Sequence, residues 1–269
     1  MPPPFGKMLA ASAIVCFSFA SGTSEASELA DSSTFLRFGL GLSFFEDTKF
    51  HDGDCSSTEP FALFGCGQGP DGRSRGARGE FDRSMMLEAA IGRRLGSRLD
   101  VELAVSYRPE LDFSGQSNFT GIALGTAPVF ADAWNASLMT NLRLHWENWL
   151  TLKKIDYRPF ISGGVGLAVN HIGSVEYQFN EIERNDRRFT QSGTQTDLAW
   201  SLGSGVEFGL SDGWGLQLAY RYVDLGEVVT DSGDFLMTRD DRADIVLQVE
   251  ETKASLTSHE VMISLNRFF

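Results

Sequence analysis

Charged residues of both signs recur in stretches of the chain where polar and apolar residues alternate. Alternation with a period of two is typical of a strand with one polar and one apolar face. Charges on the polar faces of several strands would share one narrow interior, and an unpaired buried ion is costly. The sequence therefore predicts an interior ion-pair network instead of an open pore. Its predicted members are Arg37, Glu88, Glu102, Arg143, Arg158, Glu207, Arg221 and Glu260.

Five other charged residues stand near the ends of these stretches. Glu80, Asp82 and Arg108 fall on the polar face, where we expect water to solvate them. Arg83 and Arg267 fall on the apolar face. A long side chain in that position can extend its charge to lipid headgroups, which is the role we expect for both arginines.

Residue patterns typical of catalysis are weak in this chain. His171 with Ser174 or Glu176 is one loose arrangement for nucleophilic chemistry, and Ser258 with His259 and Glu260 is another. Adjacent residues of a strand point to opposite faces, which argues against the second arrangement. We therefore predict no catalytic residue and no enzymatic activity. A lipid-modifying enzyme stays the least favoured alternative.

Metal and cofactor sites are not indicated by the sequence. The histidines lack the spacing of a metal site. The glycine-rich pieces, such as residues 163–166, neither complete the G-x-G-x-x-G pattern nor open a helix. We therefore predict no metal ligand and no cofactor. The histidines are His51, His145, His171 and His259.

The N-terminal residues have the pattern of a secretory signal peptide. Lys7 precedes an apolar run from Met8 to Ala20, and Ser24 and Ala26 offer small residues at the positions that determine cleavage. The run is too short for a transmembrane helix. We therefore predict a signal peptide over residues 1–26 and a mature domain over residues 27–269.

Two cysteines, Cys55 and Cys66, follow the predicted signal peptide. A secretory signal leads to an oxidising compartment, where the two can form a disulfide that closes a short polar loop. Two unpaired thiols are the alternative. The net charge of −13 argues against nucleic acid as a partner, since nucleic acid binds cationic surfaces.

Eight stretches of the chain show the alternation expected of strands. The connections between them run long, short, long, medium, long, short and long. Long external loops that alternate with tight periplasmic turns are typical of outer-membrane barrels. For residues 27–269 we therefore predict an all-β fold, an eight-stranded antiparallel up-and-down transmembrane β-barrel with long extracellular loops. The predicted strands are 34–44, 80–93, 99–108, 129–146, 157–169, 196–210, 214–224 and 256–269.

Aromatic residues on the apolar face distinguish a membrane barrel from a soluble barrel with an apolar core. They fall into two groups, one at each end of the strands, with aliphatic residues between them. Two aromatic girdles around an aliphatic band indicate a membrane-spanning wall. The predicted girdle at the short-turn end is Trp146, Tyr157, Trp214 and Phe269, and the girdle at the long-loop end is Phe44, Phe81, Tyr107, Phe130 and Tyr222.

Three stretches carry a resemblance to a known family. They read RPFISGGVGLAV over residues 158–169, WGLQLAYRYVDLGEV over residues 214–228, and ISLNRFF over residues 263–269. The chain resembles the small eight-stranded porin-family barrels that include the transmembrane domain of outer-membrane protein A and the opacity-type adhesins. It departs from them at Arg267, where the family usually has an apolar or aromatic residue.

The resemblance implies an integral protein of the bacterial outer membrane that supports the envelope or presents loops for surface contact. Long loops on a rigid scaffold are where recognition usually occurs. We expect contacts through residues 46–79, 170–195 and 225–255, and keep a narrow porin-like channel for small solutes as the alternative. The expected partners are outer-membrane lipid, lipopolysaccharide, the barrel-assembly machinery that receives the C-terminal strand, and a surface or host ligand.

Overall fold

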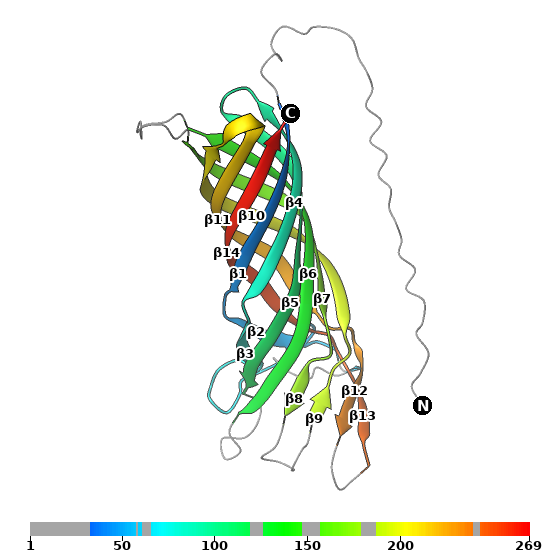
Figure 1. Cartoon of the computed structure of the whole chain (residues 1–269). Helices are drawn as coiled ribbons and strands as arrows, with labels where there is room; N and C mark the ends of the chain where they lie inside the picture. The colour runs from blue at the N-terminus through cyan, green and yellow to red at the C-terminus, as the bar shows by residue number, and fades with distance from the viewer. Residues whose placement is uncertain are drawn as a thin grey trace, which may run out of the picture. The chain divides into compact units, whose positions relative to one another are not determined.

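Eight strands of the computed structural model pair antiparallel and form a closed ring (Figure 1). Their order around the ring is their order along the chain, and β1 closes the ring against β14. This confirms the predicted up-and-down barrel. The strands are β1 (Thr34–Phe45), β4 (Ser84–Leu95), β5 (Leu99–Ser117), β6 (Ala127–His145), β7 (Tyr157–Ile172), β10 (Gly193–Gly209), β11 (Trp214–Val229) and β14 (Thr252–Phe268).

The structure describes residues 33–57, 59–60, 66–118, 126–146, 157–178, 187–238 and 243–269. Residues 31–269 belong to one compact unit. The predicted signal peptide lies outside the described residues. Within them, the chain has no helix that is both long and apolar enough to cross a membrane.

Ring closure depends on a close approach between β1 and β14. Gly39 lies opposite Ser264 in this pairing. A Cβ atom at Gly39 would lie 2.6 Å from the Ser264 Oγ and 3.0 Å from the Met262 Sδ. Any larger residue at position 39 would therefore displace side chains at the closing seam.

Six short strands extend the sheet at the long-loop end of the barrel (Figure 1). From the sequence, most of these residues are assigned to loops, because each strand is brief and bordered by charged residues. With the outer ends of β5, β6, β11 and β14, these strands form what we call the platform. They are β2 (Thr48–Asp52), β3 (Ala77–Phe81), β8 (Glu176–Gln178), β9 (Arg187–Phe189), β12 (Gly233–Thr238) and β13 (Ile245–Val249).

Bulges explain why two predicted strands end too early. The pairing of β5 with β6 shifts between Arg108 and Leu111, and the pairing of β11 with β14 shifts between Asp224 and Glu227. A bulge adds a residue to one strand and so reverses the phase of the alternation. Beyond Arg108, the inward positions of β5 are therefore odd-numbered, and the strand continues to Ser117.

The interior of the barrel has two levels of different chemistry. The level between the short turns and the bulges is lined by charged and amide side chains, among them Arg37, Glu102 and Asn141. The level inside the platform is an apolar core that includes Phe50, Phe113 and many smaller residues. The polar-inside pattern of the predicted barrel thus holds for its membrane-facing half and inverts inside the platform.

Candidate functional site

Arg37 lies at the centre of the ionic level. Its Nη1 is 2.6 Å from the Glu88 Oε1, and its Nη2 pairs with Glu102. Glu102 also accepts a hydrogen bond from the Arg143 Nη2, at 2.7 Å from its Oε2. All four side chains are buried. They come from β1, β4, β5 and β6, so these contacts tie four strands together through the interior.

Glu260 of the closing strand joins a second set of arginines to the first. Its Oε2 lies 2.5 Å from the Arg221 Nε, and its Oε1 lies 2.5 Å from the Arg108 Nη2. Arg221 in turn donates to Glu88, with 2.7 Å between Nη1 and Oε2. Glu88 and Glu260 therefore link side chains of β1 and β11 in one continuous network of ion pairs.

Arg108 corrects one expectation. Its predicted place was the solvated end of a strand, yet it is fully buried and also donates to the Asn135 Oδ1 at 2.6 Å. Because β5 continues past the bulge, Arg108 lies at mid-strand. Glu80 and Asp82 are exposed, as predicted.

A separate ionic cluster lies at the short-turn end of the interior. Glu207 is 2.8 Å from the Arg94 Nη2 and 3.6 Å from the Arg158 Nη1. Arg94 also approaches Asp100 at 3.3 Å, and the His145 Nε2 lies 2.9 Å from the Asp100 Oδ2. The prediction did not include Arg94, Asp100 and His145. Each of the three has the same even or odd numbering as the inward-facing residues of its strand. The alternation of side chains could therefore have identified them from the sequence.

The ionic level contains a small cavity. One cavity of about 20 Å³ lies among Arg37, Glu102, Asn141, Arg143 and Gln217. A cavity of this size holds about one water molecule. This space lies among the paired charges of Arg37, Glu102 and Arg143.

Three phenylalanines pack edge to face in the apolar core of the platform. The ring centroids of Phe50 and Phe113 are 4.7 Å apart, and those of Phe81 and Phe113 are 5.3 Å apart. Phe81 is only 3% exposed, so its predicted place in the long-loop girdle was wrong. The predicted strand 80–93 is in fact β3 followed by β4, and the break at residues 82–83 turns Phe81 inward.

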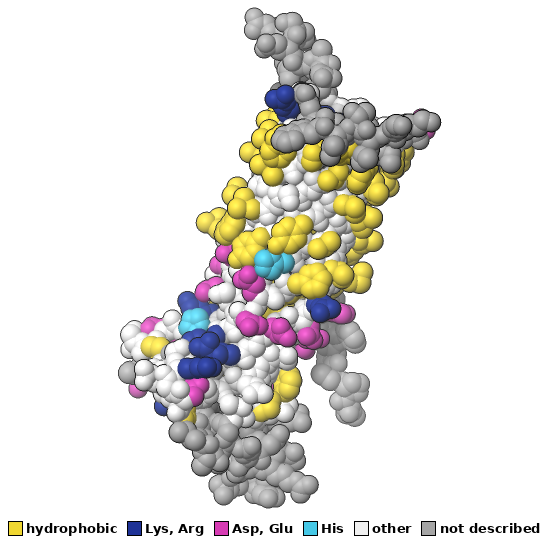
Figure 2. Space-filling model, turned by 90° about the vertical axis from the view of Figure 1, so that its left-hand side faces the viewer, with side chains coloured by type: hydrophobic (Ala, Val, Ile, Leu, Met, Phe, Trp, Pro, Cys, Tyr) yellow, Lys and Arg dark blue, Asp and Glu magenta, His cyan; other side chains and the backbone are white. Residues whose placement is uncertain are grey.

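The outer wall of the barrel carries an apolar band flanked by aromatic side chains. Figure 2 shows hydrophobic side chains spread over the wall and a band of acidic side chains beside them. At the short-turn end, Trp146, Trp214 and Phe269 are exposed, and Tyr157 is half-buried. Arg267 lies over the Trp214 ring, 5.1 Å from its centroid. An arginine on a ring face at this height can keep its charge near the headgroups.

At the long-loop end, Tyr107 is exposed, and Phe44 and Tyr222 are half-buried. Phe130 is exposed too but lies at a different height. It precedes Ala136, the cross-strand partner of Tyr107, by six residues. That separation is about 20 Å along a strand, so Phe130 belongs to the platform and not to the girdle.

Four outward carboxylates lie where the wall meets the platform. Asp112 stands directly opposite Asp132 in the β5–β6 pairing, and the Asp82 amide donates to the Asp112 carbonyl at 2.8 Å. Partial burial raises the pKa of Asp112, and the charges of Asp132, Asp82 and Glu110 raise it further. Like charges placed directly opposite each other destabilise a sheet.

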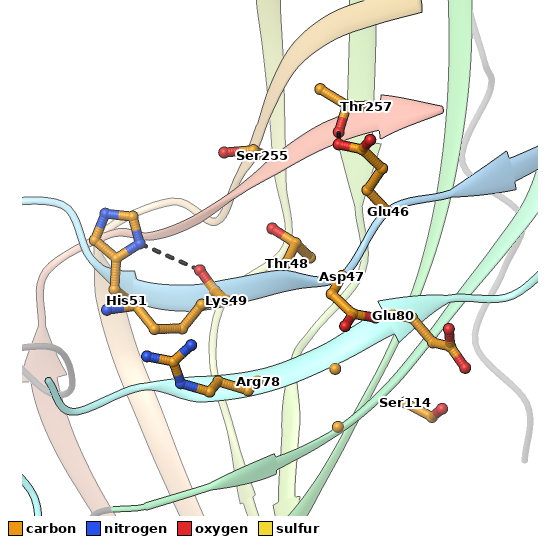
Figure 3. Close-up of a pocket in the computed structure, with 12 residues that line it drawn as sticks. Glu46, Asp47, Thr48, Lys49, His51, Arg78, Glu80, Ser114, Ser255 and Thr257 are labelled. Carbon is orange, nitrogen blue, oxygen red and sulfur yellow. Dashed lines mark hydrogen bonds between the residues drawn. The ribbon is translucent and has the colours of Figure 1, made fainter. Parts of the chain in front are cut away.

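A polar groove of about 890 Å³ opens on the outside of the platform (Figure 3). Lys49, His51 and Arg78 lie together at one end of it. Partial burial lowers the pKa of Lys49, and the nearby charge of Arg78 lowers it further. The rest of the lining is acidic or small and polar, and it comprises Glu46, Asp47, Thr48, Gly79, Glu80, Ser114, Gly115, Ser255 and Thr257.

The structure places Cys55 and Cys66 in a disulfide, with 5.5 Å between the Cα atoms. The bond spans 11 positions in the connection between β2 and β3. The groove residues Lys49 and Arg78 lie on these two strands. The disulfide therefore shortens the free chain beside the groove.

The structure gives the histidines of the weak catalytic arrangements other partners. The His171 Nδ1 lies 2.8 Å from the Thr194 Oγ1. Ser258 is buried inside the barrel, whereas His259 lies outside, where it contacts Tyr220 and Glu46. The separation of Ser258 from His259 follows the alternation of strand side chains.

Comparisons with known proteins agree with this architecture. A region of 132 residues is 28% identical to outer membrane protein PagN of Salmonella typhimurium, covering 48% of this chain. The chain therefore spans about half (50%) of the length of PagN.

Two solved outer membrane proteins align with most of this chain at low sequence identity. OprG of Pseudomonas aeruginosa aligns over 88% of this chain and 95% of its own, at 15% identity and a TM-score of 0.45. Ail, the attachment invasion locus protein of Yersinia pestis, aligns over 88% of this chain and 98% of its own, at 9% identity and a TM-score of 0.33.

The family model for the outer membrane protein beta-barrel domain matches residues 12–249. That match covers most of the chain and every strand up to the end of β13, and it leaves out β14. The chain therefore belongs to the family of outer membrane protein beta-barrel domains, and it resides in the lipid of the bacterial outer membrane.

Proposed function

We propose that this protein is a sealed, non-enzymatic anchor that supports the envelope and holds the platform outside the cell for contact with surfaces or ligands, as an adhesin does. The observation that carries this proposal is the filled interior. Paired charges occupy the membrane-facing level, and an apolar core occupies the platform. A barrel filled at both levels offers its outer surface, and not its lumen, for interaction.

The rigidity of the platform supports a role in recognition. Its strands continue those of the barrel, and its core includes fully buried side chains such as Phe50, Phe113 and Tyr177. A binding surface that is already ordered loses less conformational entropy when it meets a ligand. The groove with Lys49 and Arg78 is one part of that surface.

Two further partners follow from the position of the barrel. Lipopolysaccharide would meet the wall between the outer girdle and the platform. The barrel-assembly machinery would receive the C-terminal strand, β14, whose outward side chains are apolar from Val261 to Leu265.

Attachment assays test the proposed role. Bacteria that display the protein should adhere to cultured epithelial cells more strongly than the same bacteria with an empty vector. Equal adherence, with the platform shown to be accessible to protease on intact cells, would contradict a surface-interaction role.

Two assays address the alternatives. Purified protein in a planar bilayer should show no steady conductance, because ion pairs such as Arg37 with Glu102 occupy the interior. Reproducible conductance would support a narrow channel. Incubation with labelled phospholipid or lipid A should leave the lipid unchanged, and a modified product would support an enzyme.

A further inference from the structure

The strand β13 pairs with the rest of the platform on one side only. The order of the sheet ends with β12 and β13. Among the residues that the structure describes, no backbone hydrogen bond reaches the other edge of β13. The hairpin of β12 and β13 lies at the far end of the barrel from the C-terminus (Figure 1). An open edge at this position offers N–H and C=O groups to an extended chain.

The hydrogen bonds around β12 show which groups of β13 face the open edge. The Asp234 carbonyl accepts a hydrogen bond from the Gln191 Nε2, on the side of β12 that faces β9, at 2.8 Å. Backbone groups in an antiparallel strand alternate in direction, so Asp234 and Leu236 point away from β13. Their partners are Gln248 and Val246. The N–H and C=O groups of Gln248 and Val246 therefore point to the open edge.

Side chains beside this edge suit an added strand. Val246 is 56% exposed and lies opposite Leu236, which is 37% exposed. Together they form a short apolar strip that alternate side chains of a neighbouring strand could cover. Residues 245–249 contain no Lys, Arg or Pro, which are the residues that commonly protect an edge from pairing.

Acidic residues flank β13 in the sequence. Residues 227–253 contain eight acidic and three basic residues, a net charge of −5. Asp244 directly precedes β13 and Glu250 directly follows it. Edge-to-edge pairing of two copies in antiparallel fashion would bring Asp244 of one copy near Glu250 of the other. Charge therefore disfavours a second copy of the chain and favours a basic partner.

We propose that the open edge of β13 binds an extended, basic segment of a partner protein, which adds to the sheet as one more strand. This inference rests on the proposed surface-interaction function and names the chemistry of its partner. Backbone hydrogen bonds from Val246 and Gln248 supply affinity, the strip of Val246 and Leu236 selects alternate apolar side chains, and the acidic flanks select Lys or Arg.

Fluorescence anisotropy with a labelled synthetic peptide tests the proposal on the full protein in nanodiscs. The peptide alternates Lys with Val or Thr, and a matched peptide replaces each Lys by Glu. Val246→Pro removes an N–H that faces the open edge without removing a bond to β12. Val246→Thr is the control, because it keeps the N–H and the branched shape.

The Lys peptide should bind the wild type and Val246→Thr with affinities within about twofold, and Val246→Pro about tenfold more weakly, as expected for the loss of one to two kcal/mol. Asp244→Asn should weaken binding, and added salt should do the same. Equal binding to Val246→Pro, or equal binding of the Glu peptide, would overturn the proposal. A dimer in sedimentation that Val246→Pro abolishes would also overturn it, in favour of a second copy.

Attachment to epithelial cells separates the two proposals. If the wild type and Val246→Pro promote adherence equally, the β13 proposal fails and the surface-interaction function stands. If the wild type gives no more adherence than the empty vector, the surface-interaction function fails as well.

Discussion

Arg221 of β11 reaches across the barrel to Glu88 of β4, with 2.7 Å between Nη1 and Oε2. These strands are not neighbours in the ring. The contact therefore joins opposite parts of the wall through the interior, and its partners depend on one another. Each of the two also has a second partner, Glu260 for Arg221 and Arg37 for Glu88.

Glu260→Ala should strongly destabilise the barrel. It leaves two buried arginines, Arg108 and Arg221, without a shared carboxylate, and breaking a buried ion pair costs about 3–5 kcal/mol. Urea unfolding in lipid vesicles would measure the loss. Glu46→Ala is the matched control, because its contact with His259 is exposed and contributes less than about 1 kcal/mol. Equal effects of the two variants would show that the interior ion pairs do not hold the barrel together.

Gly39→Ala should slow or weaken closure of the ring. The added Cβ would meet the Ser264 Oγ at 2.6 Å. Ser264→Gly in the same chain removes that atom, so the double variant should recover part of the lost stability. Heat-dependent migration on detergent gels would report the folded fraction. If Ser264→Gly restores no stability, the clash lies with another side chain. Met262 is the next nearest to the added Cβ.

Phe113→Ala should loosen the platform while leaving the membrane-facing barrel folded. Phe113 is 1% exposed and packs against Phe50 and Phe81, and such a truncation costs about 3–5 kcal/mol. Limited proteolysis on intact cells should show faster cleavage of the platform. Phe130→Ala is the control, since Phe130 is exposed and its loss creates no cavity. Uniform loss of the whole barrel would show that the two levels fold as one unit.

Cys55→Ser with Cys66→Ser should have a local effect. The disulfide closes a loop of 11 positions, and removing a bridge of this size from a folded protein costs about 2–3 kcal/mol at most. Protease cleavage between β2 and β3 should increase, whereas the urea midpoint of the barrel should change little. A large drop in that midpoint would contradict a local role.

Asp132→Asn should stabilise the protein at neutral pH by a few tenths of a kcal/mol, up to about 1. Burial and the charge of Asp132 raise the pKa of Asp112 in the folded state. A raised carboxyl pKa opposes folding above the folded pKa, where both states are ionised, and this penalty disappears below the unfolded pKa. The stabilisation should therefore vanish as the pH falls. A gain that persists in acid would have another cause.

The alternation of residues determined most of the barrel from the sequence alone. Each strand must place apolar side chains toward lipid and polar side chains inward, and a period of two is enough to show this for β1, β7 and β10. The same rule selected Arg37, Glu88 and Glu260 as inward residues. Their partners remained open, because a pair such as Arg221 and Glu88 depends on how strands distant in sequence face each other across the ring.

The tertiary structure alone decided the platform. Bulges after Arg108 and Asp224 reverse the phase of the alternation. Beyond these two positions, the local alternation therefore no longer predicts how the strand continues. Phe81 looks outward-facing in sequence and is buried, because the chain breaks between β3 and β4 and joins a core made by distant strands. The sequence contains the residues of that core. That these core residues face one another becomes visible only in the pairing of β3 with β5. The hydrogen-bond register between strands distant in sequence is set by the closed ring and not by neighbouring residues.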